Sequence, residues 1–173
     1  MKLNGLRTES LPDSWPPDYP MEIYRIVREE YSDTLFASGR ANRWNLKGEE
    51  VIYTAASRSL ACLENVVHSS GESLFDKFVI MVIHFPDELA ISTLIRSQLP
   101  DDWFARAKHP FCQQLGSQWY KSQETPALQV PSAIVHQERN FVLNARHEQY
   151  GEIKVIDRRP FAFDPRIKED QYD

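Results

Sequence analysis

The residue of this sequence best suited to chemistry is an acid, Glu64, which lies in the largely apolar segment 57–68. At about 100° per residue, a helix here would place three apolar residues on the face of that acid: Leu60, Leu63 and Val67. The carboxylate is therefore predicted to point into the fold. Because a buried charge is costly without a partner, the site should also hold a cation, a proton or a cationic ligand.

Two arginines upstream of Glu64 could supply positive charge at such a site. Arg25 lies in a candidate strand, 22–27, and Arg43 lies in the polar segment 32–50. Guanidinium groups also bind phosphate oxygens through paired hydrogen bonds. Taken singly, each residue has a structural interpretation as well: Glu64 and Arg25 as members of buried ion pairs, and Arg43 as a solvated side chain. The residues alone leave both interpretations open.

Three other kinds of site find no support in the sequence. The histidines lack a spacing typical of zinc sites: His68, His84, His109, His136 and His147. No glycine-rich phosphate loop of the Gly-x-Gly-x-x-Gly type is present, so a dinucleotide would bind without that motif. Cys62 would lie about 160° around the helix from Glu64, which argues against a cysteine nucleophile there. We expect no metal site.

Length and composition predict a single soluble domain. The chain has 173 residues, of which 42% are hydrophobic, and a net charge of −5 from 25 acids and 20 bases. An acidic chain is poorly suited to direct nucleic-acid binding and better suited to a basic protein partner. We see neither a membrane span nor a secretion signal, and Cys62 and Cys112 make no disulfide framework. A cytoplasmic location is expected.

The pattern along the chain predicts one mixed α+β domain, 21–173, after an irregular, proline-rich segment, 1–20. Short strands are expected at 22–27, 50–55, 78–85, 132–136, 141–143 and 152–157, with a last apolar piece at 160–163. The strand at 78–85 is apolar almost throughout, which is typical of a strand buried on both faces. Helices are expected from Ser57, as N-cap, to Gly71, and over 111–123 despite Gly116.

Ordered motifs spread over about 22–167 resemble the RES-domain family. Those of the first half are Tyr24-Arg25-Ile26, Arg43-Trp44-Asn45, Val51-Ile52-Tyr53-Thr54-Ala55, Leu60-Ala61 and Leu63-Glu64. Those of the second half are Gly116-Ser117-Gln118-Trp119, Val130-Pro131-Ser132, Asn140 to Asn144, His147 and Phe163-Asp164-Pro165-Arg166. Each motif is short and unspecific, but their shared order and spacing make the resemblance specific.

The resemblance implies a fold, an activity and a partner. The arginine, glutamate and serine for which the family is named fall on Arg25, Glu64 and Ser132. Family members resemble ADP-ribosyltransferases, with short, mostly antiparallel strands and flanking helices. They are toxins of type II toxin–antitoxin pairs, usually beside an Xre-type antitoxin, and they attack NAD. The resemblance thus implies NAD as substrate with no separate cofactor, an antitoxin inserted into the ligand cleft, and a possible homodimer.

The implied chemistry suits the residue types at these positions. Cleavage of the nicotinamide–ribose bond develops positive charge on the ribose, which a preorganised carboxylate such as Glu64 would stabilise. Arg25 and Arg43 would anchor the pyrophosphate, Tyr53 would stack on the nicotinamide ring, and Ser132 would hydrogen-bond the ribose or the carboxamide. Singly, Tyr53 could instead be a core residue and Ser132 a turn residue.

Two departures from the family pattern and two asparagines complete the comparison with the family. Ala41 and Asn42 replace frequent paired glycines, which would narrow backbone access to a ligand phosphate. Ala145 replaces a frequent proline, which should affect only a turn. Asn140 and Asn144 are expected to hold turn backbone and are left out of the site.

The leading hypothesis is an NAD glycohydrolase toxin that depletes cellular NAD. The alternatives are an ADP-ribosyltransferase that modifies a protein, an NAD phosphorylase, and, in another class, a non-catalytic module that binds a DNA-binding partner.

Overall fold

The computed structural model describes residues 21–68 and 77–168 of the chain. The predicted irregular segment 1–20 and the predicted helix stop at Gly71 lie outside these residues. No helix in the described part combines the length and the apolar character needed to cross a membrane.

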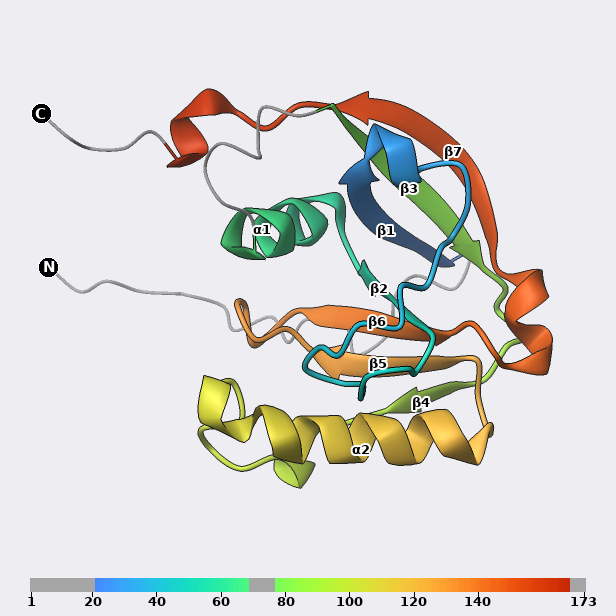
Figure 1. Cartoon of the computed structure of the whole chain (residues 1–173), viewed down its shortest axis with the longest axis vertical. Helices are drawn as coiled ribbons and strands as arrows, with labels where there is room; N and C mark the ends of the chain where they lie inside the picture. Colours follow the sequence, from blue (N-terminus) through green and yellow to red (C-terminus); the bar gives the residue numbers. More distant parts are fainter. Residues whose placement is uncertain (1–20, 69–76, 169–173) are drawn as a thin grey trace, which may run out of the picture.

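The strands form one mixed sheet in the order β4-β5-β6-β2-β1-β3-β7 (Figure 1). Their bounds are Met21–Arg28 (β1), Val51–Ala55 (β2), Phe78–Phe85 (β3), Ile91–Thr93 (β4), Ala127–Pro131 (β5), Arg139–Asn144 (β6) and Lys154–Phe161 (β7). Neighbouring strands are antiparallel except β4 and β5, which are parallel. With the helices α1 (Arg58–His68) and α2 (His109–Ser122), this is the predicted α+β domain.

The sheet nearly separates into two halves between β1 and β2. β1 pairs with β3 along its whole length, from Met21 to Arg28. Its pairing with β2 is much shorter and consists of Tyr24 opposite Ala55. In Figure 1, β1, β3 and β7 accordingly lie apart from β2, β6, β5 and β4. Because the two central strands diverge beyond this contact, side chains from both faces of β1 can reach the opening between them.

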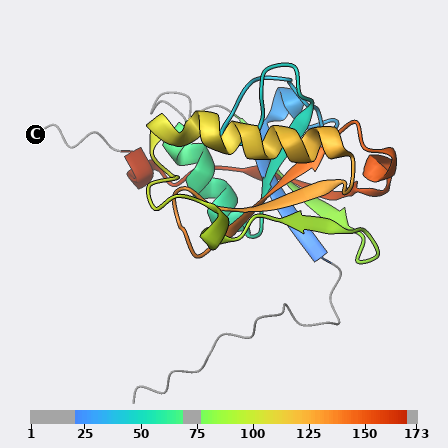
Figure 2. The ribbon, with the colours of Figure 1, turned by 90° about the horizontal axis from the view of Figure 1, so that it is seen from below.

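The core differs between the two faces of the sheet. On one face a single apolar cluster crosses both halves and includes Ile23, Ile52, Met81 and Leu143. On the other face two separate clusters lie under the two helices. Leu60 of α1 packs with β1 and β3, and Cys112 and Trp119 of α2 pack with β5 and β6. Figure 2, viewed from the side of α2, shows this helix passing in front of β2.

Much of the predicted secondary structure is confirmed. The strands expected at 22–27, 50–55, 78–85 and 141–143 correspond to β1, β2, β3 and β6, with β3 buried on both faces. The Ser57 hydroxyl accepts a hydrogen bond from the Leu60 amide at 3.1 Å and so caps α1, as predicted. The alternation in β1 is also as predicted, because Ile23 and Tyr24 belong to clusters on opposite faces.

Other boundaries were predicted wrongly. The strand expected at 132–136 is a turn, and the strand at this place is β5, which precedes it. β4 was missed because its three residues are too few to show alternation. The pieces expected at 152–157 and 160–163 largely form one strand, β7. Pro160 is tolerated in it because β7 is the edge strand of the sheet that the described residues form.

Gly116 lets α2 lie directly on the loop that precedes β2. A Cβ atom at this position would come within 1.9 Å of the Trp44 carbonyl oxygen. That separation is far inside van der Waals contact, and the obstructing atom belongs to the backbone. The glycine is therefore used for close packing, which explains its presence inside a helix in spite of its low helix propensity.

We expect Gly116→Ala to destabilise the protein by about 1–3 kcal/mol, the usual cost of overpacking, because the loop or the helix must move to admit the methyl group. Chemical denaturation monitored by circular dichroism measures this. Gly151→Ala is the matched control, since a Cβ there meets no atom within 4 Å. Equal stability of the two variants would contradict the close packing described here.

Candidate functional site

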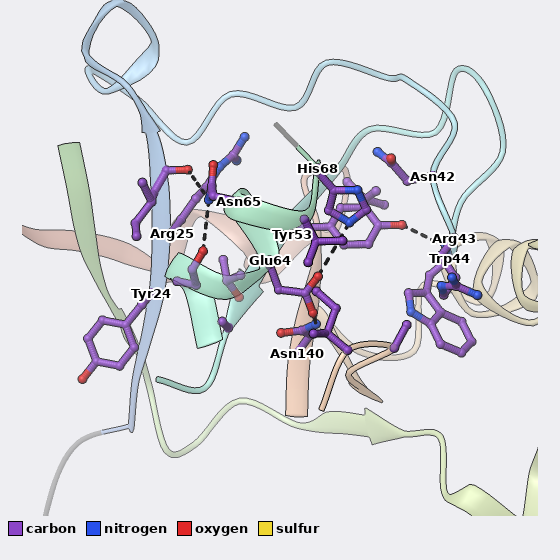
Figure 3. A pocket seen from close by; sticks show the side chains of 18 of the residues that line it. Tyr24, Arg25, Asn42, Arg43, Trp44, Tyr53, Glu64, Asn65, His68 and Asn140 are labelled. Atoms are coloured by element: carbon purple, nitrogen blue, oxygen red, sulfur yellow. Dashed lines mark hydrogen bonds and ion pairs between the residues drawn. The ribbon is translucent and has the colours of Figure 1, made fainter. Parts of the chain in front are cut away.

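A pocket of about 790 Å³ lies where the two halves of the sheet diverge. This volume is within the range of small-molecule binding sites. Its walls come from β1, β2, α1, the loop 38–44, and residues near the starts of α2 and β6. Figure 3 shows Glu64 in the middle of this pocket, with Arg25 and Asn65 on one side and Arg43 and Trp44 on the other.

Glu64 projects from α1 and is held by side chains from the other half of the sheet. Its Oε1 accepts hydrogen bonds from Ser132 Oγ at 2.9 Å and from Asn140 Nδ2 at 2.5 Å. Its Oε2 lies 3.7 Å from His68 Nε2, one turn further along α1. The side chain is 23% exposed, so the carboxylate is fixed yet still open to the pocket.

These contacts keep the carboxylate ionised. Burial by itself would raise the pKa of Glu64, but the hydrogen bonds from His68, Asn140 and Ser132 favour the charged form more strongly. The net result is a pKa below the ordinary value of 4.5. At neutral pH the pocket therefore contains a preorganised negative charge.

Ser132 contacts Glu64 from a position away from solvent. It is fully buried, and its oxygen accepts hydrogen bonds from the amides of Ile134 and Val135, each at 3.1 Å. These bonds make the turn that ends β5, so the hydroxyl proton is directed at Glu64. Ser132 was predicted to contact a substrate directly, whereas its position here is that of a support for the carboxylate.

Arg25 reaches the pocket from β1, and within residues 21–68 and 77–168 most of its hydrogen-bonding capacity is unused. Its Nη1 donates a long hydrogen bond to the Phe36 carbonyl, at 3.4 Å. Burial lowers the pKa of Arg25, although a guanidinium remains charged at neutral pH. A half-buried cation with one weak contact is well placed to take an anionic ligand.

Arg43 also lines the pocket, but its guanidinium is already engaged. Nη1 donates to the Trp103 carbonyl at 3.0 Å, and Nη2 donates to the Phe104 carbonyl at 2.9 Å. The group lies over the Trp103 ring, 5.7 Å from its centroid. Arg43 thus ties the 103–104 backbone to the pocket and retains its charge and its remaining N–H groups for a ligand.

Tyr53 contributes an aromatic ring whose hydroxyl is fixed on both sides. The oxygen accepts from the Trp44 amide and donates to Asn45 Oδ1, each at 2.9 Å. Burial raises the pKa of Tyr53 far above its usual value, so the phenol stays neutral. The ring borders the pocket while its oxygen is occupied, which suits a stacking role better than acid–base chemistry.

The pocket is cationic although the chain as a whole is acidic. Among the described residues that line it are three arginines, Arg25, Arg40 and Arg43, against the single acid Glu64; two histidines, His68 and His109, also line it. Burial, followed by the positive charges of Arg43, Arg106 and His68, lowers the pKa of His109. The described residues contain no group of three or more histidine, cysteine, aspartate or glutamate side chains placed to hold a metal ion. The arginines of the lining suit the site to an anionic ligand.

Comparison with known proteins places this fold and site in a family. The RES domain matches residues 22–164, which include the whole pocket. The chain belongs to the RES-domain family of toxins. Two relatives cover most of its length. The "Prs ADP-ribosylating toxin" of Sphingobium sp. (strain YBL2) is 39% identical over 146 residues, or 82% of this chain and 91% of that protein. The "Toxin Res" of Yersinia enterocolitica is 34% identical over 153 residues, or 86% of this chain and 100% of that protein.

A solved structure agrees on the fold. The M. tuberculosis MbcT–MbcA toxin–antitoxin complex contains a chain that matches this one with a TM-score of 0.70 and 18% sequence identity. The match covers 83% of this chain and 85% of that one. At this identity the likeness shows a shared fold, which is the RES-type fold predicted from the motifs.

The RES domain brings the predicted site residues to one place. Glu64, Arg25, Arg43 and Tyr53 line the pocket, and Ser132 contacts Glu64. The alternative of a structural ion pair between Glu64 and an arginine finds no support within the described residues, where Arg25 and Arg43 donate to backbone carbonyls. The helix face was misplaced: α1 buries Leu60, Ala61 and Val66, whereas Val67 is 54% exposed at the pocket.

Two residues of the site were missed. Asn140 was assigned to turn backbone, but it lies in β6 opposite Ala55, which turns its amide toward Glu64. The sequence did offer a signal for Asn140, because this residue begins one of the family motifs and directly precedes a predicted strand. His68 had the i, i+4 spacing from Glu64 that makes helix neighbours, yet it was weighed only as a metal ligand. Asn144 does hold turn backbone, through the Arg146 amide, as predicted.

Loss of the Asn140 amide should raise the pKa of Glu64. We expect Asn140→Ala to move this pKa upward, because the shortest hydrogen bond to the ionised form disappears while burial remains. Carbon-13 NMR titration of the Glu64 side-chain carboxyl measures the change. Asn65→Ala is the control, since Asn65 also lines the pocket but donates to the Ile26 and Ala61 carbonyls. An unchanged pKa in Asn140→Ala would contradict the assigned hydrogen bond.

The same titration has a consequence for stability. Because the folded-state pKa of Glu64 lies below its unfolded value, its contribution to stability is complete above the unfolded pKa and is lost as pH falls through the folded pKa. Asn140→Ala should weaken this acid-side dependence of the free energy of unfolding.

Proposed function

We propose that this RES-domain toxin consumes NAD by hydrolysing the bond between nicotinamide and ribose. Water replaces nicotinamide on the ribose, and nicotinamide and ADP-ribose are the products. The observation that carries the proposal is Glu64, an ionised carboxylate held by Ser132 and Asn140 in a pocket that is otherwise cationic. A site that cleaves NAD needs both properties. The carboxylate would stabilise the ribose, which becomes cationic during cleavage, and the cationic lining would bind the anionic pyrophosphate.

The chemistry follows from the charge change at the ribose. As the bond to nicotinamide breaks, positive charge develops on the ribose ring, and the pyridinium leaves as a neutral base, so the step needs no strong general acid. A fixed carboxylate beside the ribose stabilises that charge, and it can also orient or deprotonate the attacking water. Because Ser132 and Asn140 already hold Glu64, little reorganisation is required during the reaction.

The pyrophosphate is assigned mainly to Arg25. In the part of the chain that the structure describes, its guanidinium makes one long hydrogen bond, which leaves paired N–H groups for phosphate oxygens. Arg43 would contribute charge and its remaining N–H groups while holding the Trp103–Phe104 backbone in place. Tyr53 offers its ring for stacking on the nicotinamide.

Transfer of ADP-ribose to a protein is the second candidate. It is favoured by the 39% identity to a relative whose name states that it ADP-ribosylates Prs. Transfer and hydrolysis share the cleavage of NAD and differ in the nucleophile that reaches the ribose. Phosphate as the nucleophile, in a phosphorolysis, is a third possibility that the cationic pocket would also admit.

An antitoxin, of Xre type by the family resemblance, is the proposed partner. The structural neighbour was solved as a toxin–antitoxin complex, which supports a partner of this kind for the present chain. An element of the antitoxin that enters the pocket would need acidic groups to meet its arginines. A cytoplasmic location is proposed because NAD and such a partner occur there, and a homodimer stays a prediction.

The purified protein should release nicotinamide from NAD labelled in the adenylate half, with the label recovered as ADP-ribose. Chromatography of the products, with and without phosphate, separates hydrolysis from phosphorolysis. Addition of candidate proteins, including a Prs protein, tests transfer by the appearance of labelled protein. Intact NAD under all of these conditions would reject the enzymatic proposal and favour a non-catalytic binding module.

A further inference from the structure

A second buried carboxylate lies outside the pocket and has no part in the proposed chemistry. Glu49 is 6% exposed. Its Oε1 accepts from Ser117 Oγ of α2 at 2.5 Å, and its Oε2 accepts from the Leu46 amide at 2.7 Å. Lys121 Nζ stands 4.0 Å away on a side chain that is 68% exposed, so this ion pair contributes little. Burial of an acid beside a functional loop calls for a structural reason.

The loop held by Glu49 is the one that fixes Tyr53. Asn45 Nδ2 donates to the Arg40 and Leu46 carbonyls at 2.8 and 2.9 Å, while Asn45 Oδ1 accepts from the Tyr53 hydroxyl. The Trp44 amide donates to the same hydroxyl. A continuous set of hydrogen bonds thus runs from α2 through Glu49 and the 44–46 backbone to a ring in the pocket wall.

Four residues on one face of α2 contact this loop. Gln113 Nε2 donates to the Asn42 carbonyl at 2.9 Å, and Gly116 lies against the Trp44 carbonyl. Ser117 binds Glu49, and the Tyr120 hydroxyl accepts from the Glu50 amide at 3.2 Å. These four residues follow the i, i+3, i+4, i+7 spacing of a single helix face. Through this face α2 holds the loop 42–50 in place, and we call this set of contacts the clasp. Arg43 and Trp44 of the loop line the pocket.

We infer that Glu49 and Ser117 are positioning residues for the pocket, with the Ser117–Glu49 hydrogen bond as the polar centre of this clasp. The inference rests on the proposed NAD cleavage for its kinetic consequence. The clasp sets the place of Tyr53 and Arg43 on their side of Glu64, and neither Glu49 nor Ser117 touches the substrate. Displacement of a binding group by about 1 Å can reduce the rate about 100-fold.

The test compares Glu49→Ala and Ser117→Ala with the conservative Glu49→Gln. A glutamine can accept from the Leu46 amide through its oxygen and donate to Ser117 Oγ through its nitrogen, so it preserves both bonds. We expect kcat/KM for NAD to fall about 10- to 100-fold in the two alanine variants and to recover in Glu49→Gln. Ser122→Ala is the matched control, because its hydroxyl donates to the Trp119 carbonyl of the same helix.

Two readouts separate positioning from general destabilisation and from failure of the proposed function. The acid limb of the pH–rate profile should stay in place, since Ser132 and Asn140 still hold Glu64 in every variant. Amide hydrogen exchange at Trp44 and Leu46 should accelerate in the alanine variants but not in Ser122→Ala, whether or not NAD is cleaved. Unchanged exchange at these amides, or equal loss of activity in Glu49→Gln and Glu49→Ala, would overturn the inference.

Discussion

The structure depends on the attachment of one carboxylate across an incomplete sheet. Glu64 belongs to α1, which packs on β1 and β3, yet the groups that hold its Oε1 come from β6 and from the turn after β5. β1 and β2 pair at Tyr24 opposite Ala55. The hydrogen bonds to Glu64 therefore connect the two halves of the sheet where there is little backbone hydrogen bonding between them. The same divergence that opens the pocket therefore places a fixed negative charge inside it.

The pocket and the chain as a whole differ in the sign of their charge. The net charge of the chain is −5, but three arginine side chains line the pocket that contains Glu64. Such an arrangement favours a ligand with an anionic part and a part that becomes cationic. The overall acidity suggested a basic partner, but a partner element that enters the pocket would meet three arginines there.

Local pattern was sufficient where apolar residues occupy both faces of a strand. This holds for β3 throughout and for the middle of β1, so both strands were predictable. Pattern failed where a tertiary bond decides the outcome. The turn at 132–135 forms because the Ser132 oxygen accepts two amides, and Asn140 enters the site only because its register with Ala55 turns it toward Glu64. The sequence around Glu49 did not indicate its burial, since its partner Ser117 lies on a helix that is far away in the sequence.

The ordered motifs supplied what local pattern could not, because they carried Arg25, Glu64 and Ser132 into one site from three separate elements. They did not specify how each acts. The geometry gives Ser132 the role of holding Glu64, and it engages Arg43 with the backbone of 103–104, leaving Arg25 as the less occupied cation.

The most direct test of the central claim is the NAD content of cells over time after induction of this chain, beside cells that accumulate equal soluble amounts of Glu64→Gln. The account predicts that NAD collapses with the wild-type protein, while the variant, which keeps the shape of the side chain but not its charge, loses on the order of 10²–10³ in rate and leaves NAD near its starting level. Equal depletion by both proteins would contradict the role given to Glu64, and growth arrest with NAD intact would contradict NAD depletion as the toxic activity.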